Sequence, residues 1–347
     1  MQFGRSHVLP QPLIGAVIGC GFFAQNQLHA WADLPGARIV ALCDRDAVRL
    51  AETAARFGIA QTYADAGAMF AAERLDFVDI ATTVASHRPL VEMAALAGVN
   101  VICQKPFAAN MTDARAMVAA VEAAGKTLMV HENFRWQSAV RRVIEIVRSG
   151  ELGEVFFGRV SFRSGFDVFS GQPYLAEGKR FIIEDLGIHV LDIARALCGD
   201  VVRMAATTRR INPAIKGEDV ATMLLTHGSG ATSVVDCSYA TQRRPETFPE
   251  SLIDIDGTKG SLRLEAGYRL VMADRVEDLS PPVLPWASRP WHNIQESVLI
   301  VQRHFLECIA AGVQPETSGA DNLQTLALVE AAYLSAAEAR VVAVAEL

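Results

Sequence analysis

The chain has 347 residues, of which 51% are hydrophobic and 20% charged, and its net charge at pH 7 is −7. This length is enough for two domains with cores of their own, and the composition is that of an ordinary globular protein. The negative balance disfavours nucleic acid and anionic membranes as partners, because Lys and Arg must outweigh the repulsion of phosphate groups there.

The targeting and cysteine patterns favour a cytoplasmic protein. The stretch 1–12 lacks the apolar core of a secretion signal, and no segment approaches the roughly 18 uncharged apolar residues of a membrane span. The six cysteines are scattered without a CxxC pair. We therefore expect reduced thiols in the core, with no disulfide framework and no metal site.

Short apolar runs alternate with Ala-rich amphipathic stretches over the first 130 residues. The apolar runs predict strands at 13–19, 38–43, 77–82, 99–103 and 127–130. The stretches between them predict helices at 22–33, 46–57, 86–97 and 112–124. This alternation is typical of an α/β Rossmann domain with a doubly wound parallel sheet. The strands lack a period of two, as expected when helices cover both faces.

The pattern changes after residue 150. Longer, alternating segments at 154–165, 201–211, 220–227 and 231–240 predict a large open sheet, mostly antiparallel, with one face covered. Helices are predicted at 184–199, near 294–311 and at 319–340, and an ordered loop at 279–291. We expect a Rossmann domain at 1–132 and an α+β substrate-binding and oligomerisation domain at 133–347, whose last helices can pack back on the first domain.

A glycine motif lies between the first predicted strand and helix. Gly19, Gly21 and Ala24 form G-x-G-x-x-A, with Phe22 and Phe23 inside it. Gly19 would permit the tight turn, Gly21 would let a pyrophosphate approach, and Ala24 would let the helix pack closely on the sheet. The helix N-terminus would then bind the phosphates.

The second strand ends at Asp44, about 20 residues beyond the motif, where a carboxylate accepts hydrogen bonds from ribose hydroxyls. Asp44 disfavours a 2′-phosphate and so favours NAD. The neighbouring Arg45 could pair with such a phosphate, which keeps NADP open. Cys20 is interpreted as a small filler of the loop, since no second cysteine is near in the sequence.

Gln104, Lys105 and Pro106 follow the predicted strand 99–103. Ligands of open α/β sheets bind beyond the carboxyl ends of the strands, where Lys105 would lie. Pro106 restricts Lys105 to extended geometry, and the peptide bond between them can be trans or cis. A lysine in this place can donate to a substrate hydroxyl, although a lone lysine at a strand end is usually a solvated surface residue.

Asp185 and His189 lie four positions apart in a predicted helix, so they share one face, with Asp192 nearby. A carboxylate and an imidazole at this spacing suit general acid–base chemistry. The same residues also suit a plain helix start with an interior histidine. The segment 131–134, HENF, is not the metal motif HExxH, and no ligand set for a metal is evident.

In this order, the glycine motif, the Lys-Pro pair and D-x-x-x-H resemble the glucose–fructose oxidoreductase / inositol dehydrogenase (Gfo/Idh/MocA) family over nearly the whole chain. The resemblance implies a Rossmann domain, an open sheet whose outer face makes dimers or tetramers, and a substrate site between the domains. It also implies that Lys105 contacts the nicotinamide ribose and the reacting hydroxyl, and that Asp185 and His189 lie beside the substrate.

Thr82 and His87 resemble the family segment T-P-x-x-x-H, near the cofactor. Two positions depart from the family pattern: Gln104 replaces a Glu, and Thr83 replaces a Pro. Neither change removes a proposed catalytic group.

Further segments, QKPF, HENFRWQ, FRSGFDVFSGQPY and IKGEDVATMLL, resemble a branch of the family that oxidises an aldose at its anomeric carbon to a lactone. Polar side chains from these segments could form hydrogen bonds with the hydroxyls of a sugar, and aromatic ones could pack on a face of its ring. Each of them is equally suited to packing. The substrate-contact candidates are Asn133, Arg135, Trp136, Arg163, Phe166, Asp167 and, more weakly, Tyr174.

The first hypothesis is an NAD(P)-dependent dehydrogenase of a sugar or polyol. His189, oriented by Asp185, would accept the hydroxyl proton, and Lys105 would stabilise the developing alkoxide; the alternative makes Lys105 the base. Two other functions stay open: a catalytically inactive ligand-sensing regulator on the same fold, and an NAD-dependent glycoside hydrolase.

Overall fold

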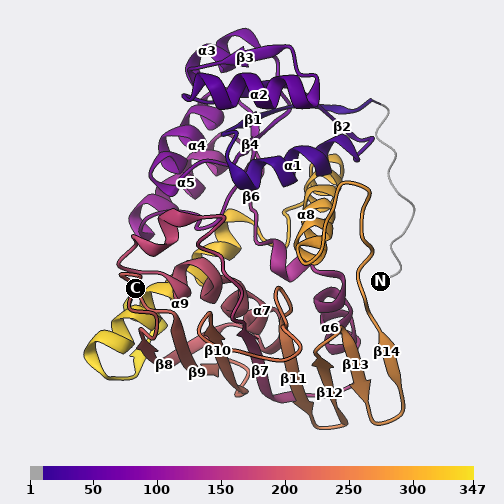
Figure 1. Ribbon diagram of the computed structural model, residues 1–347, viewed down its shortest axis with the longest axis vertical. Helices are drawn as coiled ribbons and strands as arrows, with labels where there is room; N and C mark the ends of the chain where they lie inside the picture. The colour runs from indigo at the N-terminus through magenta and orange to yellow at the C-terminus, as the bar shows by residue number, and fades with distance from the viewer. Residues whose placement is uncertain (1–10) are drawn as a thin grey trace. The chain divides into compact units, whose positions relative to one another are not determined.

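The computed structural model describes residues 11–347 (Figure 1). By their contacts these residues form two units. One comprises the chain up to Glu132 together with Val298–Leu323, and the other comprises Asn133–Ser297 together with Gln324–Leu347. Residues 298–323, assigned above to the second domain, therefore group with the first unit.

The first unit contains a parallel sheet, which in the described part of the chain has six strands in the order β3-β2-β1-β4-β5-β6. Its strands are β1 Leu13–Ile18, β2 Ala37–Cys43, β3 Gln61–Tyr63, β4 Phe77–Ile80, β5 Asn100–Cys103 and β6 Leu128–Val130. Its helices are α1 Phe22–Ala32, α2 Ala47–Phe57, α3 Ala66–Ala72, α4 His87–Leu96 and α5 Met111–Ala123. The strand order and parallel pairing confirm the predicted Rossmann-type sheet.

Two elements of this sheet region were not predicted, β3 and α3. β3 has three residues, two of them exposed, so it has no apolar run to recognise. α3 begins after Asp65, whose side chain accepts a hydrogen bond from the Ala68 N–H at 2.8 Å.

Residues from late in the chain complete the first unit. Phe305 is fully buried and its ring packs edge-on against Phe77, with centroids 5.9 Å apart. The Thr317 hydroxyl donates to the Val130 carbonyl at 3.0 Å, and Ser318 forms a β-bridge with Met129. These contacts join residues 298–323 to β4 and β6.

The second unit contains a mixed sheet, in the order β14-β13-β12-β11-β7-β10-β9-β8-β15. Its strands are β7 Val155–Arg163, β8 Val201–Arg209, β9 Val220–His227, β10 Thr232–Ser238, β11 Leu252–Gly257, β12 Gly260–Glu265, β13 Arg269–Met272, β14 Val276–Asp278 and β15 Val342–Ala343. β7 and β10 pair in parallel, and the other pairings are antiparallel, which confirms the mostly antiparallel sheet.

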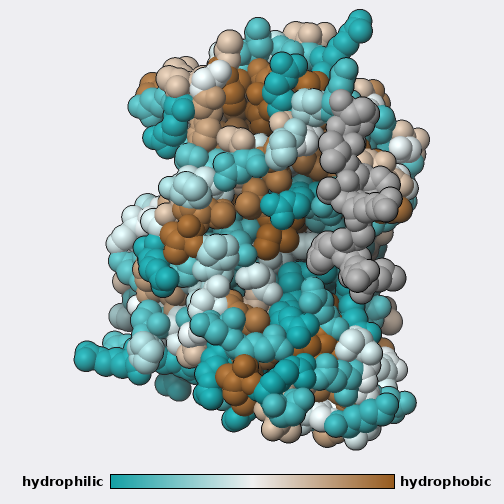
Figure 2. Space-filling model, turned by 90° about the vertical axis from the view of Figure 1, so that its right-hand side faces the viewer, coloured by the Kyte–Doolittle hydropathy of each residue, from teal (hydrophilic) through white to brown (hydrophobic). Residues whose placement is uncertain are grey.

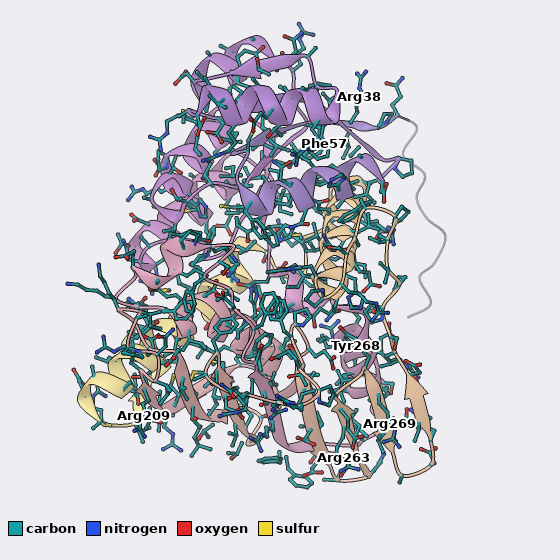
Figure 3. The ribbon with its side chains drawn as sticks, in the orientation of Figure 1. Arg38, Phe57, Arg209, Arg263, Tyr268 and Arg269 are labelled. Atoms are coloured by element: carbon teal, nitrogen blue, oxygen red, sulfur yellow. The ribbon has the colours of Figure 1, made fainter. Side chains whose placement is uncertain are left out.

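The helices α6 Ser138–Arg148 and α7 Ile188–Cys198 belong to the second unit, whereas α8 His292–Ala311 and α9 Gly319–Glu338 contribute to both units. α7 packs against β7 and β10. Arg263 on β12 and Arg269 on β13 both pair with Glu265, at 3.4 and 3.0 Å (Figure 3).

The prediction of an α-helix at 184–199 is wrong for its first turn. Ile183–Gly187 is π-helical, and α-helical geometry begins only at Ile188. The Ile188 N–H bonds to the Ile183 carbonyl, five residues earlier, where an α-helix would use the residue four earlier. The turn that carries Asp185 is therefore wider than predicted.

Between residues 11 and 347, no helix has the length and apolar character needed to cross a membrane. Over the same residues, no group of three or more His, Cys, Asp or Glu is arranged to hold a metal ion. The six cysteines are buried free thiols. Figure 2 shows one side of the molecule, where hydrophobic residues are interspersed among hydrophilic ones.

Candidate active site

Gly19 forms the tight turn after β1. Its φ is +98°, in the region that favours glycine, and a Cβ there would lie 2.5 Å from the Ala81 carbonyl oxygen. The Gly19 N–H donates to the Cys43 carbonyl at 2.8 Å. The backbone of this loop is thus pressed against the residues that follow β4, and a side chain has no room.

Gly21 is different, because open space surrounds it. Its φ of −70° is available to any residue, and a Cβ would meet no atom within 4 Å. It precedes α1, whose first turn holds no acidic residue and receives no side-chain cap from Gly21. The unfilled space beside the N-terminus of α1 fits the pyrophosphate of a dinucleotide.

Asp44 is positioned by the glycine loop itself. Its Oδ2 accepts from the Cys20 N–H at 2.7 Å and its Oδ1 from the Asp46 N–H at 2.9 Å. The carboxylate therefore lies beside the loop, where a ribose would be recognised, while Arg45 is exposed. Burial and the charge of Asp44 raise the pKa of the Cys20 thiol to about 11, which suits a buried filler.

The remaining residues of the motif line the start of α1. Ala24 is fully buried and allows close packing. Phe22 is 49% exposed, and Phe23 lies edge-on to His131 with ring centroids 5.8 Å apart.

The lysine segment follows β5, as predicted. The Gln104 side chain is buried, and its Oε1 accepts from the Lys105 N–H at 2.8 Å. Lys105 is half-buried, and its bond to Pro106 is cis. The amide that replaces the family Glu therefore supports the backbone of the lysine directly.

His87 lies between two loops at the carboxyl ends of β4 and β5. Its Nδ1 is 3.1 Å from the Phe107 carbonyl oxygen and its Nε2 is 3.2 Å from the Thr82 carbonyl oxygen. Burial lowers the pKa of His87, although the two carbonyls oppose this. Ser86 Oγ donates to Thr82 Oγ1 at 2.9 Å, which holds the turn that has Thr83 in place of the family Pro.

In the second unit, His189 is 3% exposed and stacks on Phe134, with centroids 4.2 Å apart and an interplanar angle of 9°. Asp185 is half-buried in the π turn. Burial, and then the charge of Asp185, raise the pKa of Tyr239. The imidazole is thus held flat against an aromatic ring.

Arg135 and Asp192 form a buried ion pair. Arg135 Nε donates to Asp192 Oδ2 at 2.6 Å, and Thr325 Oγ1 donates to Asp192 Oδ1 at 3.0 Å. The side chains are 5% and 0% exposed. Through these contacts, Arg135 and Thr325 bind Asp192 and hold α7 in place.

The other substrate-contact candidates have the following neighbours. Asn133 donates to Ser297 Oγ at 2.8 Å, the Trp136 ring lies 4.4 Å from the Arg141 guanidinium, Arg163 donates to Asp236 at 2.9 Å, Phe166 stacks on Phe248 at 4.1 Å, Asp167 accepts from the Phe169 N–H at 3.0 Å, and Tyr174, 66% exposed, donates to Gln172 at 2.7 Å.

Sequence reasoning missed the aromatic cluster beside His189. Phe134 lies 6.1 Å from Phe162, which lies 6.2 Å from Phe248, and Trp291 lies 4.9 Å from Phe248. Trp291 ends the loop predicted at 279–291, but no local signal connects it with Phe248.

Two family models match the chain. One, described as "Oxidoreductase family, NAD-binding Rossmann fold", matches residues 15–132, and the other, "GFO/IDH/MocA C-terminal domain", matches residues 140–263.

Two relatives named D-apiose dehydrogenase are each 62% identical. The one from Paraburkholderia graminis matches over 94% of this chain and 88% of its own, and the one from Rhizobium rhizogenes over 95% and 97%. An oxidoreductase from Agrobacterium radiobacter, solved in complex with NAD+, L-tartaric acid and magnesium, is 61% identical. It covers 96% of this chain and 99% of its own, with a TM-score of 0.95. The chain belongs to the Gfo/Idh/MocA oxidoreductase family and is an NAD(P)-dependent oxidoreductase.

Proposed function

We propose that the enzyme oxidises an aldose at its anomeric hydroxyl to the lactone, with NAD as the oxidant and D-apiose as the best single substrate. The observation that carries this proposal is 62% identity, over almost the whole chain, to two D-apiose dehydrogenases. The motif residues Lys105, Asp185 and His189 are all present in this sequence.

The first unit suits the dinucleotide. The space at Gly21 and the N-terminus of α1 would receive the pyrophosphate, and Asp44 would accept hydrogen bonds from the adenosine ribose. A carboxylate at this position repels a 2′-phosphate, which favours NAD over NADP. When bound, NAD accepts the hydride from the sugar carbon.

The proton chemistry is assigned to side chains of this chain. His189 would accept the hydroxyl proton, and Asp185 would stabilise the resulting imidazolium. Lys105 would donate to the oxygen as negative charge develops on it. In the alternative assignment Lys105, deprotonated beforehand, accepts the proton.

A screen for NADH formation tests the function. Purified enzyme is mixed with NAD and, in separate wells, D-apiose, common aldoses and cyclitols, and absorbance at the NADH band is recorded. We expect the fastest reaction with D-apiose and a lactone as the product. No NADH from any aldose would contradict the proposal and favour the sensing regulator, and free sugar released from a glycoside without net NADH would favour the hydrolase.

The first prediction concerns the proton-transfer residues. Lys105→Ala and His189→Ala should each lower kcat by at least about 100-fold, because general acid–base groups contribute roughly this much. Both variants should still bind the cofactor in a fluorescence titration of NADH, with an affinity within about threefold of the wild type for His189→Ala, because neither change alters the glycine loop. Normal turnover in both variants would refute these roles.

We further propose that the enzyme is cytoplasmic and forms homodimers or homotetramers through the open sheet. Six buried free thiols support the first point. Leu224, 51% exposed in a strand whose alternate residues are buried, supports the second. Sedimentation of the purified chain as a monomer would contradict the assembly.

A further inference from the structure

The segment 216–219, which belongs to one of the sequence stretches noted above, lies tightly against residues 176–183. The Lys216 N–H donates to the Ala176 carbonyl at 2.9 Å, and the Ile182 N–H donates to the Glu218 carbonyl at 3.1 Å. A Cβ on Gly217 would lie 2.8 Å from Phe181 Cβ. Only glycine permits this approach.

The Glu218 carboxylate binds the start of the helix that carries Asp185. Its Oε1 accepts from the Phe181 N–H at 3.1 Å and the Ile183 N–H at 3.3 Å. It also accepts from the Tyr333 hydroxyl at 2.6 Å. Together with the carbonyl of the same residue, one glutamate binds three consecutive N–H groups that have no partner within the helix. A negative charge is favourable at this end of a helix.

The partners of Glu218 are themselves fixed. Burial and the charge of Glu218 raise the pKa of the Tyr333 hydroxyl, so it stays protonated and donates. The Arg180 guanidinium lies 3.8 Å from the centre of the Tyr333 ring and also pairs with Glu330 at 2.7 Å. α9 thereby holds the carboxylate in place.

The π turn lies between two fixed ends. Glu218 binds residues 181–183 at its start, and the buried Arg135–Asp192 pair fixes α7 beyond its end. Between these two ends, the π turn spans five residues from carbonyl to N–H, one more than an α-helix. Asp185 lies in this turn.

We propose that Glu218 is a positioning residue, which places Asp185 relative to His189 by fixing the π turn. The proposal rests on the roles assigned above to Asp185 and His189. Glu218 needs no contact with substrate or cofactor, since its effect passes through the backbone of residues 181–183.

The test compares four variants with the wild type. Glu218→Ala removes all three side-chain hydrogen bonds, Glu218→Asp withdraws the carboxylate by one methylene, and Glu218→Gln keeps an acceptor oxygen. Asp219→Ala is the matched control: it loses the bonds to the Ile211 and Asn212 N–H groups, at 2.6 and 2.8 Å, in the same segment but away from the π turn. Asp185→Asn is measured in parallel.

We expect Glu218→Ala to lower kcat by about 10- to 100-fold, as displacements of about 1 Å in catalytic groups do. KM for NAD should stay within about twofold, and the deuterium isotope effect with D-apiose labelled at C1, or with the best aldose of the screen, should increase. Glu218→Gln should restore kcat to within about threefold of the wild type, because it lacks only the charge. Asp219→Ala should keep wild-type kcat.

Several results would overturn the proposal. One is a wild-type kcat in Glu218→Ala at a temperature where it remains folded by circular dichroism. If that variant does not fold, a wild-type kcat in Glu218→Asp has the same meaning. Loss of activity in Asp185→Asn but not in the Glu218 variants would overturn this inference alone. Full activity in Asp185→Asn would overturn the assigned roles and this inference with them.

Discussion

Gly19 and Gly21 lie two positions apart and are glycines for different physical reasons. Gly19 has a positive φ and no room for a Cβ beside the Ala81 carbonyl. Gly21 has an ordinary φ and open space around it. The fold itself therefore requires Gly19, whereas we assign Gly21 to the space proposed above for the dinucleotide.

The pair gives a prediction with an internal control. Gly19→Ala should lower the unfolding temperature markedly, because it combines backbone strain of about 1–3 kcal/mol with a steric clash. Gly21→Val should unfold like the wild type but bind NADH at least about tenfold more weakly, since its side chain fills the pyrophosphate space. Thermal unfolding and NADH fluorescence measure the two effects. Wild-type NADH affinity in Gly21→Val would refute the assignment of this space to the pyrophosphate.

At this scale the sequence predicted the places of the candidate residues at strand ends better than it predicted their contacts. The glycine motif, Asp44 and Lys105 were recognisable because strand ends place them without reference to distant residues. Arg135 could not be assigned in this way, because its ion-pair partner Asp192 and the supporting Thr325 lie far along the chain. The same holds for Gln104, whose bond to the Lys105 N–H needs coordinates.

Among the elements, β4 carries a buried acid at its centre. Asp79 is fully buried and accepts from Trp31 Nε1 at 2.7 Å and Gln27 Nε2 at 3.1 Å, both on α1. Gln302 on α8 approaches the same carboxylate at 3.5 Å. Burial raises the pKa of Asp79 to about 7, partly opposed by the bonds from Trp31 and Gln302.

This acid should make stability depend on pH. The pKa of Asp79 is higher in the folded than in the unfolded state. Its contribution to the free energy of unfolding is therefore complete below about pH 4 and is lost as the pH rises to about 7. The full loss is on the order of 4 kcal/mol. In Asp79→Asn the amide can still accept from Trp31 and can donate to Gln27 Oε1, so this dependence should largely disappear. Urea unfolding at several pH values measures it; parallel curves for variant and wild type would contradict the assignment.

Elements were predictable where their own residues determine them. Except for β3, the strands of the first sheet are largely buried apolar runs, and their predicted ranges agree with the structure to within about two residues. β13 and β14 have only four and three residues, and they form by pairing, β13 with β12 and β14 with β13. The π turn has no local signal either, because Glu218, far along the chain, binds its start.

At the scale of the whole molecule, the change of periodicity near residue 150 correctly indicated two architectures. The expectation that the last helices can pack back on the first domain did not specify residues 298–323, which group with the first unit. The amphipathic pattern of a helix shows that one face is buried but not against which partner.

We expect residues 1–132, expressed alone, to fail to form a cooperative fold. This fragment lacks the buried Phe305 and Gln302 side chains and the Thr317 bond to β6, and removing one large buried aromatic side chain alone costs about 3–5 kcal/mol. Joining residues 298–323 to it through a flexible linker should restore cooperative unfolding and NADH binding. Circular dichroism during heating measures this, and a cooperative transition in the short fragment would refute it.

Because the first unit is built from two distant parts of the chain, it cannot be completed early in translation. Domains usually fold as units from the N-terminus while translation continues. Here the sheet that binds the dinucleotide is synthesised by residue 130, but the helix that covers it arrives only after residues 133–297 have been translated. The nascent nucleotide-binding half must therefore keep an apolar face unburied during much of translation, and a chaperone that shields it would act on this protein before its last helices emerge.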